Sequence, residues 1–228
     1  MKLSILVPVF NEKKTILYVI DRLVELKLDG IEKEIVVVDD GSTDGTREIL
    51  KGISSDGMTI VFHEKNIGKG CAIRTAIENS SGDYVIFQDA DLEYDPGEIP
   101  KLLKKAVSGQ YGAVYGSRYF LGCPDEDTFT HYFGNRLLTG ISNLFTGLKL
   151  SDMETCYKLL KREYINKISI EENRFGLEPE ITAKMRKAGA EFAEVPINYS
   201  ARSYKEGKKI GVKDALRALF CIVKYNVF

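Results

Sequence analysis

The run Tyr84-Val85-Ile86-Phe87-Gln88-Asp89-Ala90-Asp91 decides the fold class, because an apolar stretch of strand length ends in two closely spaced carboxylates. Consecutive apolar residues of this kind predict a strand buried on both faces, as in a parallel sheet. Asp89 and Asp91 then lie where that strand leaves the sheet. Hard ions such as Mg²⁺ and Mn²⁺ prefer carboxylate oxygens, and substrate phosphates commonly complete their coordination. The alternative for such a triplet is a solvated acidic turn, so the surrounding sequence has to decide.

Short β-branched runs alternate with helical patterns through the first half of the chain. We expect strands at Leu3 to Val9, Glu34 to Val38 and Met58 to Phe62, with amphipathic helices between them. A helix that opens near Pro96 and a strand at Tyr111 to Tyr115 continue the alternation. The pattern predicts an α/β fold with a doubly wound, mostly parallel central sheet and helices on both faces.

The second half is less regular. Its expected elements, in order, are a loop at Leu121 to Thr130, a helix at Leu137 to Leu148, a strand at Thr155 to Leu160, a helix at Leu177 to Lys187, a strand at Glu191 to Tyr199, a loop at Ser200 to Lys209 and a helix at Val212 to Tyr225.

The composition is that of an ordinary globular protein of 228 residues. Lys plus Arg (32) nearly balances Asp plus Glu (33), which argues against binding to nucleic acid through overall charge. Four scattered cysteines without a Cys-x-x-Cys pair are typical of reduced, packed residues and favour the cytoplasm. No apolar run reaches membrane-spanning length without charges, and the first is too short for a signal peptide, so we expect no membrane crossing.

In an open parallel sheet, ligands bind outside the carboxyl ends of the strands. Three expected strand ends are polar: the first continues into Phe10, the second into Asp39, and the fourth into the acids at 89 to 93. Asp39 could accept hydrogen bonds from a base or ribose, Phe10 could stack on a ring, and the acids could hold a metal on a diphosphate. The residues 40–45 also read simply as a turn and a helix cap.

The segment Asn66-Ile67-Gly68-Lys69-Gly70 places glycines before a helix, but it has neither the Walker spacing nor the Gly-x-Gly-x-x-Gly spacing. A tight turn into the helix is the favoured interpretation. The alternative is that its amides or Lys69 face a phosphate.

Seven motifs occur in a specific order along nearly the whole chain. They are Val7-Pro-Val-Phe-Asn-Glu12, Val37-Val-Asp-Asp-Gly-Ser-Thr-Asp-Gly-Thr46, Asn66-Ile-Gly-Lys-Gly70, Gln88-Asp-Ala-Asp-Leu-Glu93, Gly116-Ser-Arg118, Phe175-Gly-Leu-Glu-Pro-Glu180 and Arg202-Ser-Tyr-Lys-Glu-Gly-Lys-Lys209. Together they resemble the inverting family 2 glycosyltransferases of GT-A fold, and within these the dolichyl-phosphate mannose synthase-like branch.

The resemblance implies a set of site residues. Those of the nucleoside pocket are Pro8, Phe10, Glu12, Val37 and Asp39. We expect the nucleotide-sugar site to take in also Asp89, Ala90, Asp91, Arg202 and Lys208, together with Lys69 from the glycine-containing turn and Arg118 from the end of a strand. Of these, Asp91, Arg118, Arg202 and Lys208 are expected to be catalytic. The resemblance also implies Mg²⁺ or Mn²⁺ held by Asp89, Asp91 and Glu93. Position 93 is often Gln in the mannose synthases, so Glu93 leaves the donor open between GDP-mannose and a UDP-sugar.

The acceptor depends on whether a general base is needed. A dolichyl or polyprenyl phosphate is already anionic and attacks directly, so Arg118, Arg136 and Arg202 would only position it. A sugar hydroxyl requires a carboxylate base, for which Asp152 and Glu154 are the candidates. A third hypothesis is a non-catalytic nucleotide-sugar-binding protein.

The last helix bears on membrane contact, because Leu216, Leu219, Phe220 and Val223 share one face with Val212. Such a stripe either docks onto the sheet or lies at a membrane surface. We expect one domain, 1–228, with a nucleotide-sugar half (1–116) and an acceptor half (117–228) that ends in this amphipathic helix. Its expected location is cytoplasmic, with peripheral contact at the cytosolic face of a membrane left open.

Overall fold

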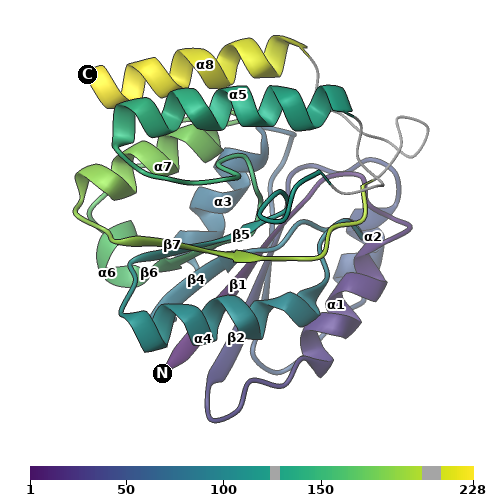
Figure 1. The fold of residues 1–228 in the computed structure, drawn as a ribbon. Coiled ribbons are helices and arrows are strands. Elements are labelled where there is room, and N and C mark those ends of the chain that lie inside the picture. The colour runs from purple at the N-terminus through teal and green to yellow at the C-terminus, as the bar shows by residue number, and fades with distance from the viewer. Residues whose placement is uncertain (124–128, 202–211) are drawn as a thin grey trace.

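The strands of the computed structural model, which describes residues 1–123, 129–201 and 212–228, join in one sheet of order β3-β2-β1-β4-β6-β5-β7 (Figure 1). They are β1 (Lys2–Val9), β2 (Glu32–Asp39), β3 (Met58–Phe62), β4 (Tyr84–Phe87), β5 (Ala113–Ser117), β6 (Lys158–Lys161) and β7 (Phe192–Pro196). The sheet has helices on both sides, so the predicted α/β fold class is confirmed.

The helices lie in layers around this sheet. They are α1 (Ile16–Glu25), α2 (Thr46–Lys51), α3 (Lys69–Glu78), the 3-10 turn η1 (Pro96–Glu98), α4 (Ile99–Gly109), α5 (Phe129–Thr146), α6 (Arg162–Ile165), α7 (Leu177–Lys187) and α8 (Val212–Val227). Figure 1 shows α1 and α4 on one side of the sheet and α3 and α7 on the other, with α5 and α8 side by side as an outer layer beyond α7.

Parallel pairing brings the ends of the first four strands to one edge of the sheet. Val9 pairs with Asp39, Asp39 with Phe62, and Leu6 with Phe87. Because parallel strands point the same way, the residues that follow them emerge together. We call this edge the rim.

The apolar pattern of the strands explains why they form a core. All four residues of β4 are buried, as are the apolar side chains in the middle of β1 and β2. Burying one such aliphatic side chain contributes about 1.5–3 kcal/mol. The core therefore fixes the strands in register, and the register fixes the rim.

The sheet is mixed, because β6 runs antiparallel to its neighbours β4 and β5. The chain enters β6 from the rim, since Asp152 just before it is bound to Arg118 just after β5. A strand that starts at the rim must run away from it. Alternation of elements along the sequence carries no such information about direction, and the short helix α6 that follows was not predicted.

The final helix buries a different face from the one its apolar stripe presents. Ala218, Cys221, Ile222 and Tyr225 are buried, and α8 packs through this face on α5 and α7. The stripe of Leu216, Leu219, Phe220 and Val223, together with Val227, is exposed. None of the helices in the described parts of the chain is long and apolar enough to span a bilayer.

Candidate active site

The acidic loop after β4 is held by side chains from three separate segments. Gln88 donates from Nε2 to the Tyr94 carbonyl (3.1 Å) and accepts from the Tyr157 hydroxyl (2.6 Å). Thr15 donates from Oγ1 to the Ala90 carbonyl (2.8 Å). These bonds span both ends of the loop, so the positions of its acids are fixed before any ligand arrives.

Each acid of the loop contacts a different group. Lys69 Nζ lies 2.9 Å from Asp89 Oδ1. Asp91 Oδ1 accepts from the Glu93 amide (3.0 Å), and Glu93 Oε2 accepts from the Tyr199 hydroxyl (2.9 Å). Within the residues that the structure describes, no three acidic, histidine or cysteine side chains converge as a metal cluster.

The carboxylates of this loop still suit a divalent ion that is also bound by a substrate. Mg²⁺ usually takes one or two carboxylates and completes its octahedron with water and substrate phosphates. Asp91, 7% exposed at the carboxyl end of β4, is placed for that role, whereas Asp89 is shared with the Lys69 ammonium. The residues therefore fit a metal carried in by a diphosphate better than a preformed cage of Asp89, Asp91 and Glu93.

Lys69 is the group that the glycine-containing turn presents to the acids. Burial lowers the pKa of Lys69, but Asp89, Cys156 and Glu178 together outweigh burial and hold the pKa well above its ordinary value. Its ammonium also lies 3.4 Å from Glu178 Oε1, at the start of α7. A permanently charged ammonium in this place can neutralise one acid of the pair at 89 and 91.

Asp40, buried at the end of β2, organises the turn that carries Lys69. It accepts from the Asn66 side chain (2.9 Å), from the amides of Ile67 (3.1 Å) and Gly68 (2.7 Å), and bonds His63 Nδ1 (2.8 Å). These amides are therefore used inside the protein. The turn serves to place Lys69, and His63 has a structural position beneath it.

Two glycines in the turn are required by close packing. A Cβ on Gly68, whose φ is +125°, would lie 2.2 Å from the Asn173 carbonyl oxygen, and one on Gly70 would lie 2.0 Å from that of Glu172. Only glycine lets these backbones approach so closely. The start of α3 is thereby pressed against the segment that leads into α7.

Asp39, predicted to bind a base or ribose, is fully buried at the end of β2. Arg47 Nε lies 2.7 Å from its Oδ2, and the Ser42 amide donates to its Oδ1 (3.2 Å). Val37 is also fully buried, in the core of the sheet, while Pro8 is half-buried at the end of β1. Of Pro8, Val37 and Asp39, only Pro8 reaches the surface.

The loops after β1 and β2 are bonded to each other. Asn11 accepts from the Thr43 amide (2.8 Å), and its own amide donates to Ser42 Oγ (2.9 Å). The Glu12 amide donates to Thr46 Oγ1 (3.0 Å). This pairing holds the half-buried Phe10 and Glu12 beside the rim.

Arg118 and Asp152 form a buried bidentate pair at the end of β5. Nε lies 2.7 Å and Nη2 2.8 Å from the two carboxylate oxygens, which also accept from the Arg118 amide (3.1 Å) and from Asn135 Nδ2 (2.8 Å). Burial raises the pKa of Asp152, but the charge and hydrogen bonds of Arg118 together with the Asn135 hydrogen bond outweigh burial and lower the net pKa. The guanidinium also lies over the rings of Tyr119 (5.1 Å) and Tyr199 (5.2 Å).

Glu154 and Glu178 differ from Asp152, because each has a carboxylate oxygen without a hydrogen-bond partner. Within residues 1–123, 129–201 and 212–228, the buried side-chain oxygens and nitrogens that lack a hydrogen-bond partner are Glu154 Oε1 and Glu178 Oε2. Burial and then Glu178 raise the pKa of Glu154 to about 8. Nearby, burial lowers the pKa of Lys158 to about 8, although Glu178 and Glu154 oppose this shift. We call Glu154, Lys158, Glu178 and Lys69 the Glu154–Glu178 cluster.

Three further residues were predicted to take part in the site: Arg136, Arg202 and Lys208. Arg136 is exposed on α5 and donates to the Ser151 carbonyl (3.3 Å). Arg202 and Lys208 lie outside the described residues. Their predicted roles are therefore left as predictions.

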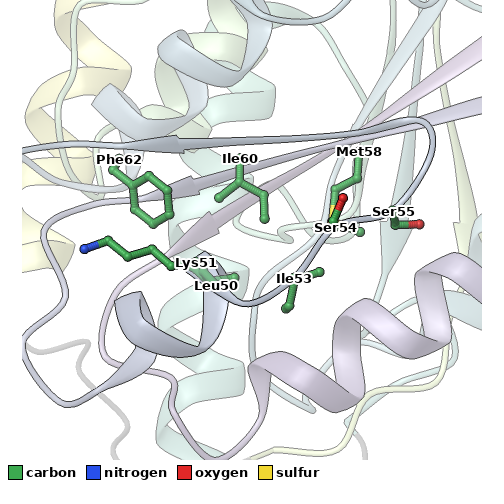
Figure 2. Close-up of a pocket in the computed structure, with 8 residues that line it drawn as sticks. All are labelled: Leu50, Lys51, Ile53, Ser54, Ser55, Met58, Ile60 and Phe62. Carbon is green, nitrogen blue, oxygen red and sulfur yellow. The ribbon is translucent and has the colours of Figure 1, made fainter.

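Two surface hollows flank the rim. The smaller, about 220 Å³, lies between α1 and the acidic loop and includes Asp91, Tyr94 and Arg22 in its lining. The larger, about 290 Å³, runs along the outer strand β3, where Figure 2 shows Ile60 and Phe62 facing Leu50 and Lys51. Of the two, the smaller hollow is the one that adjoins the acids of the loop after β4.

Sequence reasoning assigned no role to several residues that shape this site. Arg47, Lys158 and Glu178 carry or neutralise its charge, and Asp40 holds its turn. One signal was available for Lys158: a lysine followed by two leucines in an expected strand needs partners for its ammonium, and it donates to the Met153 carbonyl (2.7 Å).

Comparison with known proteins gives a consistent family and fold. A family model described as Glycosyl transferase family 2 matches residues 4–169. An uncharacterised protein of Methanocaldococcus jannaschii is 31% identical over 219 residues, covering 90% of this chain and 93% of that protein. A dolichol-phosphate mannosyltransferase of Pyrococcus furiosus is 28% identical over 99% of this chain, which spans 65% of that protein. Glycosyltransferase AglJ of Haloferax volcanii is 31% identical over 87% of this chain, which spans 63% of that protein.

Among solved structures, glucosyl-3-phosphoglycerate synthase of Mycobacterium tuberculosis, in complex with Mn²⁺, UDP and glucosyl-3-phosphoglycerate, superposes with a TM-score of 0.77. The match covers all of this chain and 80% of that one at 20% sequence identity. At this identity the likeness concerns the fold, and it supports the GT-A arrangement of the sheet.

Proposed function

The chain belongs to glycosyl transferase family 2, and we propose that it transfers a hexosyl group, with inversion, from a nucleotide diphosphate sugar to dolichyl or polyprenyl phosphate. Membership of the family makes it a glycosyltransferase that uses a nucleotide sugar. Our proposal goes further on three points. The sugar is mannose or glucose, the donor is GDP-mannose or a UDP-sugar, and the acceptor is a lipid phosphate. Residues 1–116 would bind the donor and residues 117–228 the acceptor.

The observation that carries the lipid acceptor is the apolar outer layer made by α5 and α8. On α5, Phe133, Leu137 and Leu144 are 60%, 55% and 82% exposed. On α8, Leu216 and Phe220 are 63% and 53% exposed. Exposed apolar side chains on two helices that pack side by side indicate an interaction site, and a lipid surface is the partner that suits them.

This layer is joined to the candidate active site. Asn135 of α5 is bonded to Asp152, which holds Arg118. Arg136, the next residue on α5, is exposed. A lipid tail lying along α5 would thus leave its phosphate near basic side chains, as the proposed acceptor requires.

The proposed step needs no general base. An oxygen of the lipid phosphate forms the new bond to C1 of the sugar as the bond from C1 to the donor diphosphate breaks, and the nucleoside diphosphate leaves with that electron pair. The protein holds the two anionic groups in line and screens their repulsion. Lys69 is suited to that screening because it stays charged beside Asp89.

A divalent ion, Mg²⁺ or Mn²⁺, is part of the proposal. Asp91, assisted by Asp89, would hold it, and it would neutralise charge on the leaving diphosphate. The support is the hard carboxylate pair at the end of β4 and the Mn²⁺ in the M. tuberculosis structure of the same fold.

A panel assay tests the proposal. Labelled nucleotide sugars are mixed with Mn²⁺ and short polyprenyl phosphates, and label that enters the organic phase is counted. Asp91→Asn should lower transfer at least about 100-fold with the fold intact. Asp83→Asn is the matched control, because Asp83 is an exposed acid that precedes β4, at the end of the strand opposite to Asp91. Full activity in Asp91→Asn, or no transfer from any donor, would defeat the proposal.

Peripheral attachment at the cytosolic face of a membrane is tested separately. Leu216→Glu with Phe220→Glu should abolish co-sedimentation with anionic vesicles. Val107→Glu is the control, since Val107 is 46% exposed but lies on α4, on the opposite side of the sheet. Equal vesicle binding by all three proteins would exclude α8 as the contact.

A hydroxyl acceptor is the second candidate function, and Glu154 is the observation in its favour. Its Oε1 is buried without a partner and its pKa is about 8, so it can take up a proton near neutral pH. Asp152 is less suited, because Arg118 and Asn135 occupy its oxygens. Glu154→Gln should then abolish transfer to a sugar hydroxyl with donor binding unchanged, whereas it should spare transfer to a lipid phosphate.

A further inference from the structure

Arg47, in the first turn of α2, is fixed at the carboxyl ends of β2 and β3. Its Nε lies 2.7 Å from Asp39 Oδ2, and its Nη2 donates to the His63 carbonyl. The guanidinium also lies over the Phe62 ring, 5.4 Å from its centroid. Three contacts from two strands therefore hold this side chain in a single orientation.

Arg47, rather than Asp39, reaches solvent at this part of the rim. The Asp39 side chain is fully buried, whereas the Arg47 side chain is 23% exposed and Phe62 is 37% exposed. Among the described residues, the second terminal nitrogen of Arg47, Nη1, has no hydrogen-bond partner. Any ligand edge that arrives here meets a guanidinium donor beside an aromatic ring.

The distance from the acids makes this the place for a nucleobase. Neighbouring strands lie about 4.8 Å apart, and β2 is the second strand from β4, so the end of β2, to which Arg47 is bound, lies about 10 Å from the end of β4 across the sheet. A diphosphate at Asp91 is joined to its base through the ribose. The base therefore comes to rest over the ends of β2 and β3.

We propose that Arg47 selects the nucleobase of the donor by reading hydrogen-bond acceptors on its edge, so that guanine and uracil are bound in preference to adenine and cytosine. This inference rests on the proposed function, because it concerns the same donor site. A guanidinium has only donors. Guanine offers O6 and N7 and a uracil-type base offers O4, whereas adenine and cytosine present amino groups that also donate.

Asp39 supports this role without contacting the base. Its carboxylate neutralises the guanidinium and fixes the plane of Arg47 through Nε, and with Nη2 bound to the His63 carbonyl this leaves Nη1 as the donor for a ligand. Lysine at position 47 would keep a positive charge beside Asp39 but would lack the planar pair of donors.

The experiment compares matched nucleotides on matched variants. Affinities of GDP, ADP, UDP and CDP are measured by calorimetry with Mg²⁺ on the wild-type chain, on Arg47→Lys and on Lys51→Met. Lys51 is the control because it lies one turn further along α2, on the hollow next to Phe62 (Figure 2), and removal of its charge leaves the Asp39 pair in place. Arg47→Lys is chosen because a neutral residue would leave Asp39 buried and unpaired.

In the wild type, GDP should bind at least about 10-fold more tightly than ADP, and UDP more tightly than CDP. Arg47→Lys should reduce these ratios to about 3-fold or less by weakening the keto nucleotides, and Lys51→Met should preserve them. Equal affinity within each pair in the wild type, or unchanged ratios in Arg47→Lys, overturns the inference while the proposed function stands. Failure of all four nucleotides to bind overturns the proposed function and the inference with it.

Discussion

The rim at the end of β2 and the Glu154–Glu178 cluster both contain buried acids. Only at the rim does every buried carboxylate oxygen have a hydrogen-bond or ion-pair partner. Asp39 and Asp40 receive bonds from Arg47, Ser42 and the turn at 66–68. In the cluster, Glu154 and Glu178 each keep a buried oxygen without a partner among the described residues. Buried acids whose oxygens all have partners make a rigid scaffold. A buried acid with an unpaired oxygen carries charge that a ligand or a proton must balance.

The largest change in stability is expected at the rim, where the buried acids have partners. Asp40→Ala should lower the free energy of unfolding by about 3 kcal/mol, because the buried donors of Asn66, Ile67 and Gly68 lose their acceptor. The measurement is urea unfolding followed by circular dichroism. Asp44→Ala, in the same loop but exposed, should cost only about 1 kcal/mol. Equal losses for the two variants would show that the rim is not organised by Asp40.

The stability of the protein should depend on pH through the Glu154–Glu178 cluster. The folded pKa of Glu154 is raised from 4.5 to about 8, so between these pH values the folded protein keeps a proton that the unfolded chain has lost. Its contribution is fully present below pH 4.5 and is lost as pH rises toward 8. The shifted pKa of Lys158 acts above pH 8 and does not interfere in this window.

Glu154→Gln should therefore flatten the fall in unfolding free energy between pH 5 and pH 8. Urea midpoints at several pH values provide the measurement, with the exposed Glu64→Gln as a control that keeps the wild-type profile. An unchanged slope in Glu154→Gln would mean that the acid is not held protonated, and the contrast with the rim would disappear.

The smallest effect concerns the contact between the acidic loop and the chain entering residue 200. Tyr199→Phe removes the hydroxyl that donates to Glu93 (2.9 Å) and should cost about 1 kcal/mol in unfolding free energy. Backbone bonding between Ser200 and Glu93 is retained, which limits the loss. Tyr18→Phe, on the exposed surface of α1, provides the comparison. A loss above about 3 kcal/mol would mean that Tyr199 has a larger structural role than one hydrogen bond.

The ends of β1 to β4 could be predicted because they depend on local patterns. The apolar run at Tyr84–Phe87 became a strand buried throughout, and Asp89 and Asp91 emerge from it as expected. The turn at 66–70 could be recognised but not its purpose, since the atoms that require Gly68 and Gly70 belong to Glu172 and Asn173, about a hundred residues away in the chain.

Charge pairing was the least predictable part of the site. Asp152 was a candidate base in the sequence, and only the fold brings it to Arg118, 34 residues earlier, where both of its oxygens are bound. Glu154 lies two residues further along and keeps an unmet oxygen. Two acids only two residues apart thus have opposite surroundings, because the chain turns at residues 153 and 154 before it enters β6.

By itself, the sequence determined the family, the α/β class and the acids that leave β4, because motifs and hydrophobic periods are local properties of the chain. Tertiary structure alone decided the antiparallel direction of β6, the pairing of Asp39 with Arg47 and the face that α8 exposes. An apolar stripe such as Leu216, Leu219 and Phe220 has the same period whether it packs inward or faces outward. Only the surfaces that α5 and α7 offer to Cys221 and Ile222 settle which side is buried.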